Sequence, residues 1–304
     1  MTSFLQVLLD ALSLGSLFAL TALGIGLLFG ILRLINFAHG EYVTVGAYSL
    51  AVPASTAVTT TVLGTDSVVP VILLVTASVL VLAVVSDRLV FKPLRTASAS
   101  VMMIASFALS YVIQNLLIMI HGGRPKALSI WPELTESLVF QELRVAKLQL
   151  VVVAITAVTL VALVLFLKRS RFGIQLRAAS EDFKMSCYLG VQSNKIIAIG
   201  FIISGILAAI VSLLLLSQTG VLSPGMGANI VLYAFIATII GGLGSLLGSV
   251  LGGFVIGMAS TFLQTYLPLE VRSFRDAFLF ALVILFLVVR PQGIVKVKAL
   301  QERV

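Results

Sequence analysis

The residue types best suited to chemistry gather in one short polar run that interrupts apolar sequence. Asn36, His39 and Glu41 bring an amide, an imidazole and a carboxyl group together, with Gly40 among them and Gly46 just beyond. Polar groups in apolar surroundings are costly unless they meet partners or water. The run therefore fits either a broken helix whose free backbone groups are satisfied inside the protein, or an ordinary turn between two helices.

The composition places this run in a membrane protein. Of the 304 residues, 60% are hydrophobic and 11% are charged, whereas soluble domains carry about 25% charged residues. The mean hydropathy is +1.16, and apolar runs recur at lengths near the roughly 20 residues that a spanning helix needs. The runs lie near 7–32, 42–63, 68–91, 101–120, 148–167, 196–217, 228–240, 246–267 and 277–290.

These runs predict an all-α fold, a polytopic transmembrane helix bundle of about eight or nine spans. The runs 228–240 and 277–290 are short, and eight spans would follow if one segment is re-entrant. A β-barrel is excluded because barrel strands alternate polar and apolar residues, whereas these runs are apolar all round. We expect residues 1–304 to form a single transmembrane domain without a soluble one.

Basic residues are distributed unequally between the loops. They gather in the loops 33–41, 87–100 and 168–195 and in the C-terminal tail, which the positive-inside rule assigns to the cytoplasm. The N-terminus is then external and the C-terminus cytoplasmic, and the net charge of +8 needs no nucleic acid to explain it. The cytoplasmic set is Arg33, Arg88, Lys92, Arg95, Lys168, Arg169, Arg171, Arg177, Lys184, Lys195, Arg290, Lys296, Lys298 and Arg303, against Arg124, Lys126, Arg144, Lys147, Arg272 and Arg275 outside.

The longest external loop, 121–147, holds the only tryptophan, Trp131. This side chain is placed either to anchor at the membrane interface or to pack within the loop. We expect the segment 133–147 to form a short surface helix. The only histidines, His39 and His121, fall on opposite sides, and no nucleophile and base are paired. We therefore expect no catalytic residue and no metal site, and predict that the chain is not an enzyme.

The cytoplasmic loop 168–195 carries the signals of a short amphipathic helix. Ser180 is the expected N-cap, and Gly190 fits the end of the helix. Phe183 and its neighbours supply an apolar side. Such a helix between two spans suits docking into a groove on a soluble partner, and the alternative is a basic tether without a partner.

A glycine-rich stretch follows near the C-terminal third of the chain. Gly244, Gly248 and Gly252 recur every four residues, preceded by Gly241 and Gly242. This spacing of small residues predicts close packing of helix backbones. No Gly-Lys-Ser or Gly-Lys-Thr occurs, so the chain has no Walker A motif. If transport is driven by ATP, another polypeptide must hydrolyse it.

No acidic residue is expected deep within an apolar run, which counts against an ion-coupled secondary transporter. This observation does not exclude a stand-alone passive channel. The uncharged amides Gln114, Asn115 and Gln218 are expected to hydrogen-bond between helices. Contact with a polar solute is the alternative for them.

Several separated motifs occur in an order that resembles a known family. Over residues of about 10 to 295 the chain is similar to the high-affinity branched-chain amino acid ABC permeases, and to the smaller of their two paralogous permease subunits. The motifs are Ala19-Leu-Thr-Ala-Leu-Gly-Ile-Gly, Asn36-Phe-Ala-His-Gly with Gly46-Ala-Tyr, Arg177-Ala-Ala-Ser-Glu-Asp with Leu189-Gly-Val, Gly241-Gly-Leu-Gly-Ser, and Arg290-Pro-Gln-Gly.

The resemblance implies a permease domain in the plasma (inner) membrane of a bacterium or archaeon. Its partners would be a second permease subunit, two cytoplasmic ABC ATPases that hydrolyse ATP, and an extracytoplasmic solute-binding protein, with no cofactor on this chain. Members of the family also transport urea, short amides and other amino acids, so the solute stays open. A stand-alone channel or secondary transporter for such a neutral solute is the alternative function.

The resemblance also implies roles for particular residues. The coupling helix that docks on the ATPase would contain Arg177, Ser180, Glu181, Asp182, Phe183, Lys184, Leu189 and Gly190. Independently of the resemblance, the broken-helix interpretation of the polar run would place Asn36, Phe37, His39, Gly40, Glu41 and Gly46 beside the pathway.

Overall fold

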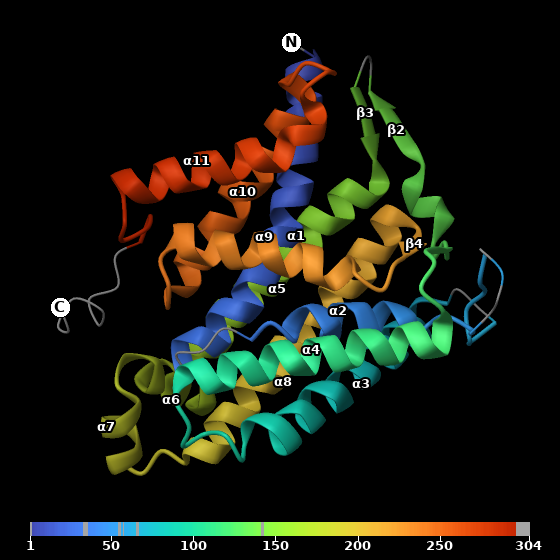
Figure 1. Cartoon of the computed structure of the whole chain (residues 1–304). Helices are drawn as coiled ribbons and strands as arrows, with labels where there is room; N and C mark the ends of the chain where they lie inside the picture. Colours follow the sequence, from blue (N-terminus) through green and yellow to red (C-terminus); the bar gives the residue numbers. More distant parts are fainter. Residues whose placement is uncertain are drawn as a thin grey trace.

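The computed structural model describes residues 2–32, 36–53, 56, 58–64, 67–140 and 143–295. Arg33, Lys296, Lys298 and Arg303 of the expected cytoplasmic set lie outside these residues. The helices are α1 (Thr2–Leu32), α2 (His39–Tyr48), α3 (Val68–Ser86), α4 (Ala99–His121), α5 (Lys147–Arg169), α6 (Arg171–Glu181), α7 (Phe183–Tyr188), α8 (Ser193–Thr219), α9 (Met226–Gly241), α10 (Leu246–Tyr266) and α11 (Arg275–Val289) (Figure 1).

The prediction of a multi-spanning helix bundle is confirmed. Among the described residues, six helices are long and apolar enough to cross a bilayer, namely α1, α3, α4, α5, α8 and α10. Helices α9 and α11 have 16 and 15 residues and fall short of that length. Of the apolar window in α1, 89% is buried, against 17% in α4. Helix α1 is therefore the centre of the bundle, and α4 presents its apolar surface outward.

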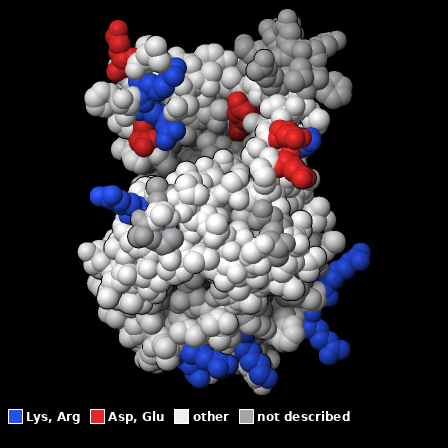
Figure 2. Space-filling model, turned by 90° about the vertical axis from the view of Figure 1, so that its right-hand side faces the viewer, with Lys and Arg blue, Asp and Glu red and all other residues white. Residues whose placement is uncertain are grey.

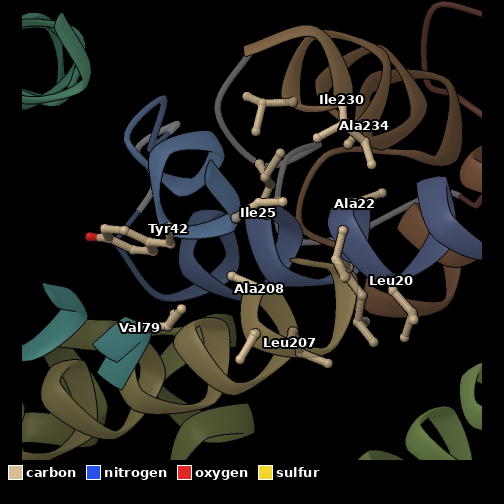
Figure 3. Packing of buried hydrophobic residues seen from close by; sticks show 14 of the residues in the cluster. Leu20, Ala22, Ile25, Tyr42, Val79, Leu207, Ala208, Ile230 and Ala234 are labelled. Atoms are coloured by element: carbon tan, nitrogen blue, oxygen red, sulfur yellow. The ribbon is translucent and has the colours of Figure 1, made fainter. Parts of the chain in front are cut away.

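The core forms where α1 meets α2, α8 and α9. Figure 3 shows Leu20, Ala22 and Ile25 of α1 between Leu207 and Ala208 of α8 and Ile230 and Ala234 of α9. Glycines bring α10 onto another part of α1, because a Cβ at Gly253 or Gly257 would overlap the α1 backbone at Ala19 or Gly15. Backbone contact of this kind provides dispersion attraction that larger side chains would prevent.

One expected span is wrong. The apolar run 42–63 does not continue as a helix, since α2 ends at Tyr48. The chain then folds back on itself, and Val62 N–H donates to the Leu50 carbonyl at 2.8 Å. Pro53 has no N–H for a helix, and the β-branched threonines 59–61 favour extended backbone.

The expected surface helix over 133–147 is also wrong. Pro132–Thr135 forms a 3-10 turn, and β2 (Ser137–Phe140) pairs antiparallel with β3 (Leu143–Ala146). Lys147 bridges Glu136 at 2.6 Å across the base of this hairpin. The ammonium group beside it lowers the pKa of the Glu136 carboxyl. Alternation and β-branched residues outweigh helix propensity in this segment.

The loops assigned to the cytoplasm gather at one end of the bundle. Arg95 binds the Asp87 carboxylate at 2.6 Å and also the side chain of Asn194, joining the turn after α3 to the start of α8. At the same end, Val295 N–H donates to the Gly241 carbonyl at 3.0 Å. At the other end, β1 (Lys126–Ala127) pairs with β4 (Val221–Leu222). These contacts agree with the predicted division of the loops into two groups. Residues 36–41 are the exception, because they were assigned to a cytoplasmic loop and lie inside the bundle.

Candidate functional site

The polar run at 36–41 lies inside the bundle and is not a cytoplasmic turn. Helix α1 ends at Leu32, yet α2 begins at His39 beside Gly24, eight residues earlier in α1 than its end. The chain therefore turns back along α1 before α2 starts, which is a break in the helical path. His39 is fully buried, so the backbone that surrounds the break is enclosed by protein, as membrane depth requires.

His39 is held by small residues of two long helices. Its Nδ1 lies 3.0 Å from the hydroxyl of Ser204 in α8, which also lies 3.3 Å from the Gly24 carbonyl. The imidazole Nε2 faces Gly24, where an added Cβ would lie only 2.8 Å away. That nitrogen has no hydrogen-bond partner among the described residues. Gly24 is consequently the residue that leaves room for the imidazole.

Glu41 is an acidic residue in the interior of the bundle, where none was expected. Its side chain is 1% exposed, and the Ser110 hydroxyl of α4 donates to its Oε1 at 3.1 Å. The expectation failed because Glu41 was assigned to a cytoplasmic loop. The chain reversal before α2 carries it inward against α4.

Asn36 and Phe37 fix the entry into α2. The Asn36 side-chain oxygen accepts from the Ala38 N–H at 3.1 Å, and the Phe37 N–H donates to the Ser106 hydroxyl at 3.3 Å. These bonds satisfy backbone donors that precede a helix and have no partner within it. The Phe37 ring packs edge-on against Phe107 of α4 and Phe235 of α9. Phe37 thus ties the break to α4 and α9.

The first turns of α2 and α9 meet directly. A Cβ at Gly40 would lie 2.6 Å from the Gly227 carbonyl, and the Gly227 N–H donates to the Thr44 hydroxyl at 3.1 Å. On the other side of α2, a Cβ at Gly46 would lie 2.7 Å from the Ser212 hydroxyl of α8. Two short helices therefore begin side by side within the protein. Ser110, Ser204 and Gly227 were not anticipated as partners, although small polar residues in apolar helices are the available signal.

The loop 168–195 folds as two helices that project from the bundle (Figure 1). Ser180 is not the N-cap, because it lies in the last turn of α6 and its hydroxyl donates to the Arg177 carbonyl at 2.8 Å. The caps are Ser170 and Asp182, which accept from Gly173 N–H at 2.9 Å and Met185 N–H at 3.0 Å. The Asp182 carboxylate is an equally good cap and interrupts the single helix that was expected.

Helix α7 ends just before Gly190, as the sequence predicted. Gly190 has φ +92°, its N–H donates to the Cys187 carbonyl, and the Val191 N–H donates to the Ser186 carbonyl at 3.1 Å. This pair of bonds is the Schellman arrangement, in which glycine avoids the steric cost of a left-handed conformation.

An apolar tip projects from this loop, and we use that term for Met185, Tyr188 and Leu189. Tyr188 is 83% exposed and Leu189 is 84% exposed. Phe183 instead packs against the core of the bundle, and Glu181 and Asp182 are exposed beside it. The side chain of Lys184 lies outside the described residues.

The glycine stretch divides between helix packing and a turn. A Cβ at Gly241, Gly248 or Gly252 would overlap backbone of the facing helix, so α9 and α10 are in contact there. Gly242 and Gly244 differ from the packing role expected for them. They lie in the turn between α9 and α10 with φ of +108° and +88°, a region that favours glycine. Gly244 lies four residues before Gly248, as in a helical stripe of glycines. However, α10 begins only at Leu246, so Gly244 precedes the helix.

Comparison with known proteins identifies the family. The model of the branched-chain amino acid transport system permease component matches residues 7–287. The chain belongs to this family. It is 35% identical to the high-affinity branched-chain amino acid transport system permease protein BraD of Pseudomonas aeruginosa, over 96% of this chain and 95% of that protein.

Other relatives agree with this family assignment. The permease protein LivH of the same kind of system in Escherichia coli K12 is 32% identical over 96% of this chain and 95% of its own length. A probable LivH of Methanocaldococcus jannaschii is 29% identical over 95% and 91%. No solved structure matches the chain. The branched-chain amino acid permease family comprises transporter subunits and not enzymes, so the sequence prediction on that point is confirmed.

Proposed function

We propose that this chain is one permease subunit of an ABC importer for branched-chain or related amino acids. Separate ATPase subunits would drive it, a second permease subunit would complete the pathway, and an extracytoplasmic binding protein would deliver the solute. The observation that carries the proposal is the projecting α6–α7 loop with its exposed apolar tip, on a chain of this permease family. The family assignment favours this function over a stand-alone channel.

The apolar tip is suited to a soluble partner. Large apolar side chains that project beyond the bundle cost free energy in water, and burial of such surface in a groove yields roughly 25 cal/mol per Å². Asp182 and Gly190 set the start and end of α7, so the tip is presented on a preformed element. Preorganisation of this kind lowers the entropy cost of docking.

The helix break would allow the pathway to alternate between outward and inward openings. Helices α2 and α9 are short, begin beside each other and contact α8, α4 and α1 through glycine, serine and threonine. Short helices tied by few hydrogen bonds can rotate as units when the coupling loop moves. Asn36, His39 and Glu41 are buried within the subunit, so their proposed role is to hold this hinge beside the pathway.

The orientation follows from the basic loops. The end that carries Arg88, Lys92 and the α6–α7 loop would face the cytoplasm, because cytoplasmic loops are enriched in Lys and Arg. The N-terminus of α1 would then be external and the C-terminus cytoplasmic, in the plasma (inner) membrane.

The test is uptake by the reconstituted complex. The chain, its partner permease, the ATPases and the binding protein, taken from neighbouring genes, are placed in liposomes with labelled leucine. We expect uptake only with ATP and with every component present. Uptake by this chain alone at the same rate would contradict the proposal.

Replacing Glu181, Asp182 and Gly190 together should leave membrane insertion of the chain intact. In the reconstituted complex, ATP should then be hydrolysed without leucine uptake.

A further inference from the structure

A polar pocket of about 440 Å³ lies at the end of the bundle that we propose to be external. It is lined by the N-terminal part of α1, the first turn of α5 and parts of α8 and α10, together with Thr135 and Ala146. Figure 2 shows acidic side chains together with basic ones in the upper half of one face, whereas only basic ones stand at the lower edge. The pocket is large enough for a small organic molecule.

Asp10 is the charged group of this pocket. Its Oδ1 accepts from Gln149 Nε2 at 2.6 Å and from Gln6 Nε2 at 3.3 Å. The ion pairs of the described residues involve Asp87, Glu136 and Asp276, so no described Lys or Arg is paired with Asp10. A carboxylate whose hydrogen-bond partners are neutral amides keeps its negative charge uncompensated, and that charge attracts a cation. The pocket thus favours a cation.

Among the described residues, the pocket also contains a hydrogen-bond acceptor without a partner. Gln149 Oε1 is buried and has no hydrogen-bond partner among the described residues. Gln218 donates its Nε2 to the Ser13 hydroxyl at 3.0 Å, and Thr261 donates to the Gly257 carbonyl at 3.0 Å. One N–H of Gln218 and the Thr261 hydroxyl are therefore engaged within the protein, whereas the Gln149 oxygen and the Asp10 carboxylate can still accept. A primary ammonium group has three donors and no acceptor, which matches this lining.

An apolar cavity of about 660 Å³ adjoins the polar pocket, and Leu148 lines both. Trp131, Leu134, Ile155 and Leu214 are among its walls. The polar pocket carries the Asp10 carboxylate and the Gln149 oxygen, and the neighbouring cavity is mainly aliphatic. A molecule with an ammonium group and a branched hydrocarbon chain complements both cavities.

We propose that Asp10 and Gln149 bind the ammonium group of an aliphatic amino acid at the outer end of the pathway, with its side chain toward Leu148 and Trp131. This inference rests on the proposed function for the nature of the solute and for the orientation. It assigns this subunit a share of the specificity that would otherwise reside in the binding protein alone.

Tryptophan fluorescence of the full chain in lipid nanodiscs tests the proposal. Trp131 is the only tryptophan and lines the apolar cavity, so its emission reports on occupancy. The probes are leucine, isopentylamine, 4-methylpentanoate and sodium chloride. We expect saturable changes with leucine and isopentylamine, which carry the ammonium group. No saturable change is expected with 4-methylpentanoate, which lacks it, or with sodium chloride.

The Asp10→Asn variant separates charge from structure. Asparagine keeps an oxygen that accepts from Gln149, so the contact between α1 and α5 survives while the charge is lost. A hydrogen-bonded charge pair contributes about 1.5–3 kcal/mol, so the isopentylamine midpoint should rise about tenfold or more. Glu270→Gln is the matched control, because it removes an exposed carboxylate that lies in neither cavity.

The titrations and the uptake assay test the inference and the proposed function separately. An unchanged midpoint in Asp10→Asn, equal binding of 4-methylpentanoate, saturation by sodium chloride, or no response to any probe would overturn the inference. In the complete complex, normal leucine uptake by Asp10→Asn would overturn it and leave the proposed function standing. Uptake that does not depend on ATP would instead contradict the proposed function, while the isopentylamine titration of the chain would remain valid.

Discussion

At the residue scale, this protein depends on glycine and small hydroxyl side chains to bring helices together. Gly24 admits the His39 imidazole, and Gly40 and Gly227 let two helix starts meet. Gly248 has the same role between α9 and α10, where the Gly241 carbonyl occupies the space of a side chain. In lipid the hydrophobic effect does not drive helices together, so such backbone contacts carry much of the association.

Gly248→Leu should therefore destabilise the bundle. Leucine raises helix propensity by less than about 1 kcal/mol, whereas overpacking against backbone costs about 3 kcal/mol or more because the Gly241 carbonyl cannot rotate away. Thermal unfolding of the purified protein in detergent measures the loss. Leu247→Ala, at a neighbouring exposed position, should change the midpoint little. Equal stability of Gly248→Leu and the wild type would show that the helices are not in contact there.

At the scale of elements, the α6–α7 loop is the part most clearly built for contact with another molecule. Its two helices have side-chain caps at Ser170 and Asp182 and a glycine end at Gly190. Phe183 holds α7 to the bundle, and Tyr188 and Leu189 project from it. A rigid element with an exposed apolar tip is the form that groove docking requires.

Tyr188→Asp and Leu189→Asp should weaken docking of the ATPase without unfolding the permease. Both side chains are more than 80% exposed, so a charge there costs the isolated chain little, whereas in a groove it is desolvated and costs several kcal/mol. Co-purification of the ATPase and thermal unfolding are measured together. Leu269→Asp, 78% exposed beyond the end of α10, is the control. Full ATPase recovery with both tip variants would remove the docking role.

At the scale of the whole molecule, the chain has two chemically distinct ends. One end gathers the basic loops, the α6–α7 loop and residues 294–295, whose N–H groups donate to carbonyls at the end of α9. The opposite end gathers the hairpin, the β1–β4 pair and the Asp10 pocket. A permease with this polarity would receive solute at one end and mechanical work at the other.

The single cysteine tests this orientation. Cys187 lies half-exposed in α7, so a membrane-impermeant maleimide should label it in inverted membrane vesicles and not in intact spheroplasts. The chain is expressed without its ATPase to leave α7 free. Cys187→Ser combined with Leu269→Cys should show the opposite pattern. Labelling of Cys187 in intact spheroplasts would reverse the topology and with it the proposed direction of coupling.

Much of the architecture was predictable from the chain itself. Long apolar runs indicated a membrane bundle, and the uneven distribution of Lys and Arg separated most loops into two groups. Both the presence of spanning helices and the side on which a loop lies can be predicted from local sequence. A spanning helix requires a certain length and apolar composition, and the orientation follows from the number of Lys and Arg residues in each loop. The helix end at Gly190 was likewise readable, because the left-handed conformation selects glycine locally.

Only the tertiary structure decided where the polar groups lie. Glu41 counted as a loop residue until the chain reversal placed it against Ser110, and Asp10 meets Gln149 across 139 positions of sequence. The apolar run at 42–63 predicted a span, yet the helix that enters it from His39 ends at Tyr48. Contacts between distant segments depend on how helices pack, and a one-dimensional pattern of polar and apolar residues contains no record of which faces meet.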